Sequence, residues 1–406
     1  MRFRDFYDYY DQLSELLQSE NLDSAKYAAA LLSVKDPHGD LKFLQVINPE
    51  DVYRNRNAMD WAFDDIILMH LQTLYFISRG DWAEACAAQT SILQLFNREI
   101  LQKEKDANWF MPILYIICSD LRLISIVADS NRSAVRRRKT EAASFYEEAA
   151  APIMESYRMC VAESRLAPET TKKIAILNLT NQLFRIYFKI NRLHLLKPLI
   201  RSIDHVGDLY DFFSTADKIT YNYFLGRKAM FDMDLSLSEK SLSFAFENCP
   251  SSHKRNKRAI LMYLIPVKMF LGHMPTAQLL SFYNLEQFLS VVTSVKDGNL
   301  RQLNEALQEH QHFFIKCGIF LMLEKLKVVT YRNLFKKVAL ILNTHMIKLD
   351  AFSVAIRWLG SDMDSDELAC ILANLIAQKK IKGYISHQKQ TLVISKQTPF
   401  PPLSTL

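Results

Sequence analysis

Apolar residues recur every three to four positions along most of the chain, from its start to about residue 380. Between Ile66 and Tyr75 they form one face, and a second periodic segment runs from Trp82 to Phe96. Arg79-Gly80-Asp81 separates the two segments. A period near 3.6 residues indicates amphipathic helices, and a Gly-Asp pair indicates a turn. The pattern therefore predicts two helices joined in a tight hairpin.

The same arrangement recurs further along the chain. A helix predicted at Tyr221–Asp232 is followed by one at Leu237–Phe246. A third helix, Asn256–Leu271, ends at Gly272-His273-Met274-Pro275, after which Thr276 can cap the next helix. Because a single hairpin cannot bury its own apolar face, such hairpins stack. The sequence thus predicts an all-α fold, a tetratricopeptide-like superhelix of helical pairs.

The pattern changes near residue 345. The predicted elements are, in chain order, helices at Tyr331–Asn343, Asp350–Trp358 and Asp366–Gln378 and strands at Ile381–His387 and Thr391–Ser395. Ser365 is the expected N-cap of the third helix. Helices followed by a β hairpin are the order of a winged helix. The Pro-rich tail at 397–406 can extend neither element.

Composition agrees with a helical protein of the reducing compartments. The 406 residues include only 9 glycines and 12 prolines, which disfavours many tight turns. Six widely spaced cysteines without a CxxC pair are expected to be reduced and mostly buried. The most apolar run, Arg258–Gly272, contains Pro266 and Lys268, and the N-terminus lacks a secretory leader. Membrane insertion and secretion are therefore not expected.

Charge is distributed unevenly along the chain. Residues 1–130 carry 12 Lys and Arg against 20 Asp and Glu, whereas residues 131–300 carry 24 against 16 and residues 301–406 carry 14 against 8. The asymmetry suggests a polyanionic partner for the basic two thirds, although a solvated face is the alternative. Two local clusters, Arg136–Lys139 and Lys254–Arg258, are expected in solubilising loops, with a phosphate or acidic-peptide contact as the alternative.

Known catalytic and metal-binding motifs are absent from the sequence, which contains no HExxH, GxSxG or phosphate-binding glycine loop. His310 and His312 are two positions apart, and two such side chains diverge on a helix. We expect a surface pair of histidines there rather than a metal site. Neither an enzymatic activity nor a cofactor is predicted.

Basic residues gather around the predicted hairpin rather than on the helix before it. That helix begins Asp364-Ser365-Asp366-Glu367 and has no Lys or Arg before Lys379, so it is unsuited to reading bases in a DNA groove. The candidate nucleic-acid-binding residues are Arg332, Lys336, Lys337, Lys379, Lys380, Lys382 and Lys389. Arg332 and Lys336 are four apart and should share a helix face. Lysines of this kind suit phosphate binding without sequence specificity, and a solvated wing is the alternative. Tyr384 is expected in the core rather than stacked on a base.

A second basic set lies in the helical region. Lys189, Arg192, Lys197 and Arg201 recur every three to five residues, which predicts a stripe along one helical face and its continuation. An acidic, disordered peptide could bind this stripe and fold on it. A solvated face is the alternative.

Several blocks of the sequence, covering about residues 100 to 406, resemble the PCI domain-containing protein 2 family. These blocks are Asn181–Leu193, Lys197–Arg201, Gly226–Asp232, Leu264–Met269, Tyr331–Lys337, Lys382–His387 and Ser395–Pro401. The resemblance implies a PCI subunit of transcription-and-export complex 2, with a large GANP-type scaffold and a small acidic Sem-type protein as partners. It also implies that paired winged helices bind RNA and double-stranded DNA. The segment Ser130–Thr140 is more basic than the connector usual in that family.

From this resemblance we expect helical repeats at 1–200, the tetratricopeptide-like part of a PCI domain at 201–310 and its winged-helix part at 311–396. The expected function is that of a non-catalytic subunit in nuclear, transcription-coupled mRNA export. The expected location is the nucleus and the nuclear pore periphery, with the cytoplasm as a further option. The alternative is a purely structural PCI scaffold in a signalosome-like or proteasome-lid-like complex, without nucleic-acid contact.

Overall fold

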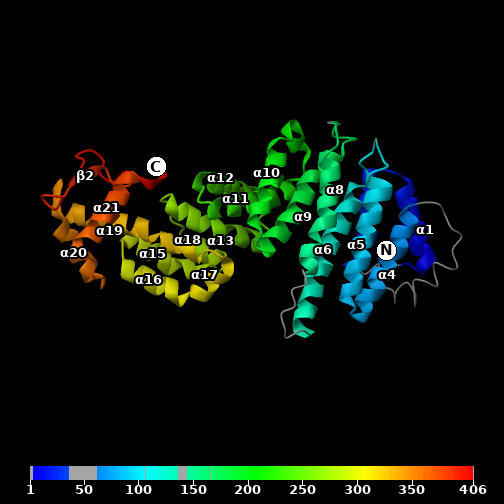
Figure 1. Ribbon diagram of the computed structural model, residues 1–406, viewed down its shortest axis with the longest axis horizontal. Helices are drawn as coiled ribbons and strands as arrows, with labels where there is room; N and C mark the ends of the chain where they lie inside the picture. The colour runs from blue at the N-terminus through cyan, green and yellow to red at the C-terminus, as the bar shows by residue number, and fades with distance from the viewer. Residues whose placement is uncertain (1–2, 36–61, 106, 136–143, 166, 406) are drawn as a thin grey trace. The chain divides into compact units, whose positions relative to one another are not determined.

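The computed structural model describes residues 3–35, 62–105, 107–135, 144–165 and 167–405, excluding the predicted basic loop at 136–139. The chain forms two compact units, Met1–Tyr221 (unit 1) and Asn222–Leu406 (unit 2). The finer division predicted at residues 200 and 310 stays a prediction. The mostly helical architecture, with a small sheet near the C-terminus, confirms the predicted fold class (Figure 1).

Unit 1 is entirely helical in its described part. Its α-helices are α1 Phe6–Gln18, α2 Leu22–Leu31, α4 Ala62–Arg79, α5 Trp82–Phe96, α6 Met111–Val135, α7 Phe145–Glu148, α8 Ala150–Val161, α9 Ile176–Lys189 and α10 Leu196–Asp204. Helix α11, Thr215–Phe231, begins in unit 1 and ends in unit 2. The predicted hairpin is confirmed, since α4 and α5 pack on each other around the turn at Gly80. Helix α6 packs on α5 in turn.

Helix α6 is the most membrane-like helix of the described chain. Its segment Met111–Arg132 is long and apolar enough to cross a membrane, but more than half of that segment is buried inside the protein. Its polar residues bind other parts of unit 1. The Asp120 carboxylate accepts a hydrogen bond from the backbone N–H of Val34 at 2.9 Å, and Arg122 Nε donates to Gln182 Oε1 at 2.8 Å. Helix α6 is thus a core helix of unit 1.

Unit 2 continues with short helical hairpins. Its α-helices before the sheet are α12 Leu235–Asn248, α13 Lys254–Phe270, α14 Ala277–Phe282, α15 Leu289–Asp297, α16 Leu300–Glu309, α17 Gln311–Cys317, α18 Phe320–Lys325 and α19 Lys327–Leu342. A Cβ atom on Gly226 of α11 would lie 2.6 Å from Leu242 Cγ, so glycine permits the close approach of α11 and α12. Ser238 Oγ donates to the Gly226 carbonyl oxygen at 2.8 Å across this contact. The predicted cap is also confirmed, since Thr276 Oγ1 accepts from Leu279 N.

The expected loop at 251–258 is wrong, because α13 already begins at Lys254. Its N-cap residue, His253, makes no capping hydrogen bond with its side chain, and the first turn contains no acidic residue. Usual start signals of a helix are an N-cap side chain and acidic residues in the first turn. Both start signals are missing here, so no local feature of the sequence marks Lys254 as the start of α13.

The winged-helix part consists of α19 followed by β1 Met346–Lys348, α20 Leu349–Trp358, α21 Ser365–Ala377, β2 Gly383–Ser386 and β3 Thr391–Ile394. The three strands form an antiparallel sheet in the order β1-β3-β2. Strand β1 was not predicted, because only its middle residue, Ile347, is buried. The N-cap of α21 is Asp364 rather than Ser365, since Asp364 Oδ1 accepts from Glu367 N at 2.6 Å.

One apolar core joins the winged-helix elements. Phe335 of α19 and Phe352 of α20 meet edge to face, with ring centroids 5.0 Å apart. Leu372 of α21 and Leu392 of β3 are fully buried in the same cluster. Because every helix and strand contributes to this core, the hairpin formed by β2 and β3 is held in a fixed position on α21.

Candidate nucleic-acid interface

The hairpin begins just after the C-terminus of α21, where three predicted lysines lie. Lys379 has a left-handed backbone, with φ of 59°. The N–H groups of Lys379 and Lys380 donate to the carbonyl oxygens of Ile376 and Leu375, at 2.9 Å each. These are the bonds of a Schellman motif, in which glycine is the usual residue at the left-handed position. A lysine occupies this position and its side chain is exposed.

The three lysines differ in accessibility. Lys379 and Lys382 are exposed, whereas Lys380 is half-buried and its Nζ atom donates to Gln378 Oε1 at 2.7 Å. Burial lowers the pKa of the Lys380 ammonium. The backbone of Lys382 is fixed, because its N–H donates to the Pro399 carbonyl oxygen at 2.8 Å. Lys379 and Lys382 are therefore the predicted residues best placed to meet phosphate at the base of the hairpin.

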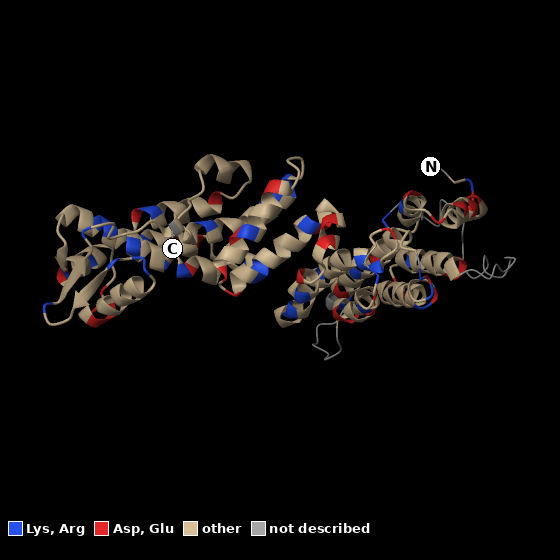
Figure 2. Ribbon diagram, turned by 90° about the horizontal axis from the view of Figure 1, so that it is seen from above, with Lys and Arg blue, Asp and Glu red and all other residues tan. Residues whose placement is uncertain are grey.

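The other end of the hairpin carries Lys389. Its neighbour Gln390 accepts hydrogen bonds at 2.9 Å from the backbone N–H of Leu349 and from Ser365 Oγ. The hairpin tip is thus joined to the beginnings of α20 and α21. Lys389 is exposed there. Figure 2 shows basic positions at the hairpin tip and on the neighbouring helices of unit 2.

Arg332 does not form part of this exposed set, contrary to the prediction. It is only 6% exposed, and its Nη2 atom donates to the carbonyl oxygens of Phe400 and Pro401 at 3.1 and 2.7 Å. Its guanidinium also lies 5.8 Å from the Phe400 ring centroid. Arg332 and Lys336 line one groove, as expected for residues that share a helix face, but Arg332 is buried there because it holds the C-terminal tail.

Lys336 and Lys337 lie on α19 beside a groove of about 600 Å³. Lys296 of α15 lines the same groove, although sequence reasoning missed it. Lys337 Nζ forms an ion pair with Asp297 Oδ1 at 3.2 Å, so its charge is partly compensated. Lys296 was not predicted because it is distant in sequence from Lys336. Only the packing of α15 on α19 brings the two residues near each other.

The first turn of α21 contains Asp366 and Glu367 after the N-cap Asp364, so this end repels phosphate. Tyr384 of β2 is 63% exposed, which makes the expected core position wrong. Its neighbour Ile385 packs on the core, so strand alternation places Tyr384 on the opposite, solvent-facing side of β2.

The predicted basic stripe is divided between two helices. Lys189 ends α9, and Asn191, with φ of 58°, turns the chain before Lys197 and Arg201 on α10. Arg192 lies in that turn and forms an ion pair with Glu147 Oε1 at 2.5 Å. The four residues therefore lie on two helices and the turn between them, and their role in binding an acidic partner stays a prediction. Lys197 and Arg201 are four residues apart and share one exposed face of α10.

The winged-helix part also exposes several large apolar side chains. Ile341 is 81% exposed at the end of α19, and Trp358 is 83% exposed at the end of α20. Leu340 and Met346 are exposed as well, and Met346 lies on the edge strand β1. Exposed apolar residues near a free strand edge are typical of a protein interface. The run Leu340-Ile341-Leu342 was the available signal, since three successive helix positions cannot all face one core.

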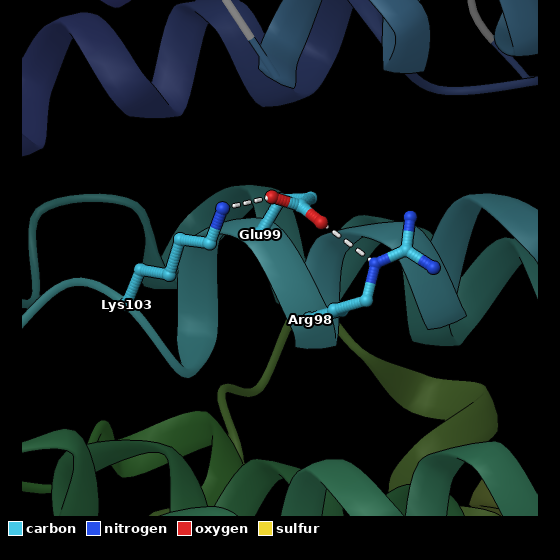
Figure 3. Close-up of polar contacts among 3 residues, drawn as sticks. All are labelled: Arg98, Glu99 and Lys103. Atoms are coloured by element: carbon cyan, nitrogen blue, oxygen red, sulfur yellow. Dashed lines mark hydrogen bonds and ion pairs between the residues drawn. The ribbon is translucent and has the colours of Figure 1, made fainter.

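Unit 1 contains a cavity of about 900 Å³ beside the π-helical turn Asn97–Leu101. Two of the cations that line it, Arg98 and Lys172, have partners. The Glu99 carboxylate lies between Arg98 and Lys103, as Figure 3 shows, and Lys172 Nζ donates to the Leu101 carbonyl oxygen at 2.6 Å. Hydrogen bonds from Lys103 and Arg98 lower the pKa of Glu99. The described lining contains neither histidine nor cysteine, which are the usual bases and nucleophiles of a catalytic pair.

Cysteine thiols and histidine rings are the remaining side chains that could act as nucleophiles, bases or metal ligands. All six cysteines are free thiols, four of them buried, as predicted. Burial raises the pKa of Cys160 to about 12, so this thiol is unreactive. His310 packs edge-on against Phe314. Within the described ranges, no three His, Cys, Asp or Glu side chains converge on a possible metal position.

Comparisons with known proteins agree with this architecture. The PCI domain family model matches residues 307–396, which include the whole winged-helix part. The PCI domain-containing protein 2 homolog of Caenorhabditis elegans is 53% identical over 99% of this chain and 98% of its own length. PCI domain-containing protein 2 of Xenopus laevis is 47% identical over 98% of both chains. Protein CSN12 homolog of Schizosaccharomyces pombe is 30% identical over 85% of this chain and 84% of its own. The chain therefore belongs to the PCI domain-containing protein 2 family.

Proposed function

We propose that this chain is a non-catalytic subunit of a nuclear complex that couples transcription to mRNA export, and that it binds RNA and double-stranded DNA without sequence specificity. The observation that carries the proposal is the winged-helix hairpin, whose exposed lysines flank it at both ends. Lys379, Lys382 and Lys389 have no carboxylate within 4.0 Å in the described part of the chain. Their charges are therefore available to phosphates.

The lack of sequence specificity follows from the chemistry of the hairpin. Lysine ammonium groups bind phosphate oxygens as point charges and carry no base-reading geometry. The acidic start of α21 disfavours entry of this helix into a DNA groove. The presence of Lys379 in a left-handed position also supports a role for its side chain, since glycine would fit that backbone with less strain.

Two protein partners complete the proposal. A large GANP-type scaffold subunit binds the edge strand β1 and the exposed apolar residues Leu340, Ile341 and Met346. A small acidic Sem-type protein binds α10 through Lys197 and Arg201, whose side chains are exposed. The assembly works in the nucleus, at the periphery of the nuclear pore. A PCI subunit of this kind contributes shape and charge, and other proteins of the assembly carry out any catalysis.

A purely structural role is the second candidate, in a signalosome-like or proteasome-lid-like complex. The name of the fission yeast relative, a CSN12 homolog, favours it. Affinity purification of the tagged chain from nuclear extract, followed by mass spectrometry, separates the two. A GANP-type scaffold with a Sem-type protein supports the export complex. Signalosome or lid subunits overturn the export role and make the hairpin a protein interface.

The nucleic-acid interface is tested with the variant Lys379→Glu/Lys382→Glu/Lys389→Glu. Each lost phosphate contact should lower the slope of log affinity against log salt by about 0.7 to 0.9, so the triple variant should lose about 2 to 3 units of slope. Binding of labelled RNA and duplex DNA is titrated at two salt concentrations. Lys240→Glu/Lys316→Glu/Lys325→Glu is the charge-matched control, because these three lysines are exposed elsewhere in unit 2.

The single variant Lys379→Gly removes one charge, and glycine fits the left-handed backbone at this position without strain. It should keep or raise the stability of the chain while weakening binding, because glycine relieves the left-handed conformation. If the control triple variant weakened RNA binding equally, the change in net charge alone would explain the effect. Unchanged affinity and slope in the hairpin variants would overturn the proposed interface.

A further inference from the structure

Helix α13 begins with a dense basic cluster that the proposed function does not use. Lys254, Arg255, Lys257 and Arg258 fall within its first five residues, with no acidic residue in the first turn. The N-terminal end of a helix carries a partial positive charge, so cations there are unfavourable. His253 provides no side-chain cap for the free backbone N–H groups. Such an end is suited to receive an anion.

The four cations have no acidic partner within the described chain. None lies within 4.0 Å of a carboxylate, whereas Lys268 on the same helix forms an ion pair with Glu239. Arg258 instead donates from Nε and Nη2 to the Asn284 carbonyl oxygen, at 3.3 and 3.2 Å. This contact joins the start of α13 to the turn that follows α14. The cluster thus keeps its positive charge and a fixed position.

Aromatic rings accompany the cluster. Lys254 Nζ lies 4.5 Å from the centroid of Phe282, and Lys257 Nζ lies 4.4 Å from that of Phe246. Tyr283 connects the two rings edge to face, with centroids 4.9 Å from Phe282 and 6.1 Å from Phe246. These contacts hold the rings in place beside the cations. We call these residues, Lys254, Arg255, Lys257, Phe246, Phe282 and Tyr283, the α13 patch.

Phe282 is the exposed aromatic ring of the α13 patch, whereas Phe246 and Tyr283 are half-buried. Lys254 lies against its ring, yet 59% of the side chain is exposed. Exposure of a phenylalanine ring to water is unfavourable, and a partner that covers the ring lowers the free energy. A nucleic-acid base is a flat partner that an aromatic ring binds by stacking, while neighbouring cations bind the adjacent phosphates.

We propose that the α13 patch binds single-stranded RNA, with one base stacked on Phe282 and the adjacent phosphates on Lys254, Arg255 and the free N–H groups of α13. This site is separate in sequence from the hairpin and deepens the proposed function, on which it rests for the identity of the ligand. A stacking ring beside unpaired cations favours RNA over an acidic peptide, which requires the cations alone. Duplex DNA is excluded from Phe282, because its bases are already stacked on each other.

The test uses the full chain and a fluorescein-labelled 15-residue oligouridine, with affinity measured by anisotropy. Phe282→Leu keeps an apolar side chain but removes the ring, and it should weaken binding roughly 5- to 100-fold. Phe282→Trp keeps stacking and should restore at least the original affinity. Lys254→Glu/Arg255→Glu should weaken binding and lower its salt dependence. Lys240→Glu/Lys325→Glu is the charge-matched control, and circular dichroism verifies that each variant is folded.

A 15-base-pair DNA duplex distinguishes this site from the hairpin. Phe282→Leu should leave duplex affinity unchanged, whereas the triple lysine variant of the hairpin should weaken both ligands. If the hairpin variant alone weakens oligouridine binding, the α13 patch is not an RNA site and the proposed function stands. If Phe282→Leu alone weakens it, the α13 patch stands and the hairpin proposal fails. Intact RNA binding in the patch variants, together with lost binding of an acidic peptide such as oligoglutamate, would make the patch a protein-binding site and overturn the inference.

Discussion

Arg332 in α19 donates a hydrogen bond of 2.7 Å to the carbonyl oxygen of Pro401, 69 residues further along the chain. The C-terminal tail that it holds also accepts from the Lys382 N–H at the base of the hairpin. Further on, Leu403 packs so closely on Gly272 that a Cβ atom there would lie 2.8 Å from Leu403 Cβ. The tail therefore joins the winged-helix part to the helical hairpins of unit 2. The sequence indicated only that this tail extends neither helix nor strand.

The first prediction concerns this tail. Arg332→Ala should lower the free energy of unfolding by about 2 to 4 kcal/mol, because it leaves buried carbonyl oxygens without a charged donor. Arg332→Lys should restore only part of the loss, since an ammonium cannot reproduce the fork of a guanidinium. Urea unfolding followed by circular dichroism measures both.

Lys336→Ala is the matched control, one helical turn along α19. It is exposed, so the expected change is within about 0.5 kcal/mol. If Arg332→Ala and Lys336→Ala proved equally mild, the tail would contribute little to the stability of unit 2. Among folded proteins, Lys336→Ala should lower RNA affinity more than Arg332→Ala does.

The second prediction concerns the hairpin. A Cβ atom on Gly383 would lie 2.3 Å from the Val393 carbonyl oxygen and 3.1 Å from Ile394 Cα. Both atoms belong to the backbone of β3, which cannot move without breaking the pairing of Gly383 with Ile394. Gly383→Ala should therefore cost about 2 to 3 kcal/mol and weaken RNA binding by displacing the hairpin lysines. Thermal unfolding and RNA titration measure the two effects.

Gly360→Ala provides the comparison for Gly383. Gly360 has a φ of 80° with nothing within 4 Å of the added Cβ, so only backbone strain of about 1 kcal/mol is expected, without loss of RNA affinity. Equal effects of the two substitutions would mean that the close approach of β2 and β3 is not what requires glycine at position 383.

The elements predicted best from sequence were those with a strong local signal. Helices α4 and α5 combine a clear apolar period with a Gly-Asp turn, and their ends were found within a few residues. Strand β1 has three residues with one buried side chain, and pairing with β3 rather than its own pattern defines it. The start of α13 lacks a cap and acidic residues, so no local signal marks it. Local chemistry thus decided what could be predicted.

The candidate site was predicted less well than the fold, since charge in a sequence does not give burial. Arg332 and Lys382 belong to the same basic set, yet the tail covers the first and leaves the second exposed. Arg192 carries the same charge as Arg201, but Glu147 from a distant segment neutralises it. Tyr384 was expected in the core, but Ile385 is the residue of β2 that packs there, and alternation leaves Tyr384 on the other face. Each difference depends on contacts between segments far apart in sequence.

The third prediction concerns the acidic partner. Lys197→Glu/Arg201→Glu should release a small acidic subunit from the purified complex, because both side chains share the exposed face of α10 and have no carboxylate within 4.0 Å in the described ranges. Arg192→Glu should release less, since Arg192 is already engaged by Glu147. Co-purification at increasing salt measures both. Retention of the acidic subunit by the double variant would make this face of α10 merely solvated.

The fourth prediction concerns the pH dependence of unit 1. His70 of α4 is buried, and its Nε2 atom has no hydrogen-bond partner in the described chain. Burial lowers the pKa of His70 from 6.5 to about 4. Because the folded pKa is depressed, the unfolded chain takes up the proton first as pH falls below 6.5. The stability that neutral His70 allows is present above pH 6.5 and is lost as pH falls toward 4, by up to about 3 kcal/mol.

His70→Leu removes this proton uptake, so its free energy of unfolding should fall less than that of the original chain between pH 6.5 and pH 4. Asp120 titrates in the same window with the opposite sign, since burial raises its pKa to about 6 and its protonation favours the folded state as pH falls. That contribution is common to both proteins and cancels when their unfolding energies are subtracted. Urea unfolding at pH 7.5, 5.5 and 4.5, followed by circular dichroism, gives the difference. Parallel curves for the two proteins would show that His70 is solvated or protonated in the folded state. Divergence that grows toward pH 4 would identify its burial as a source of acid sensitivity in unit 1.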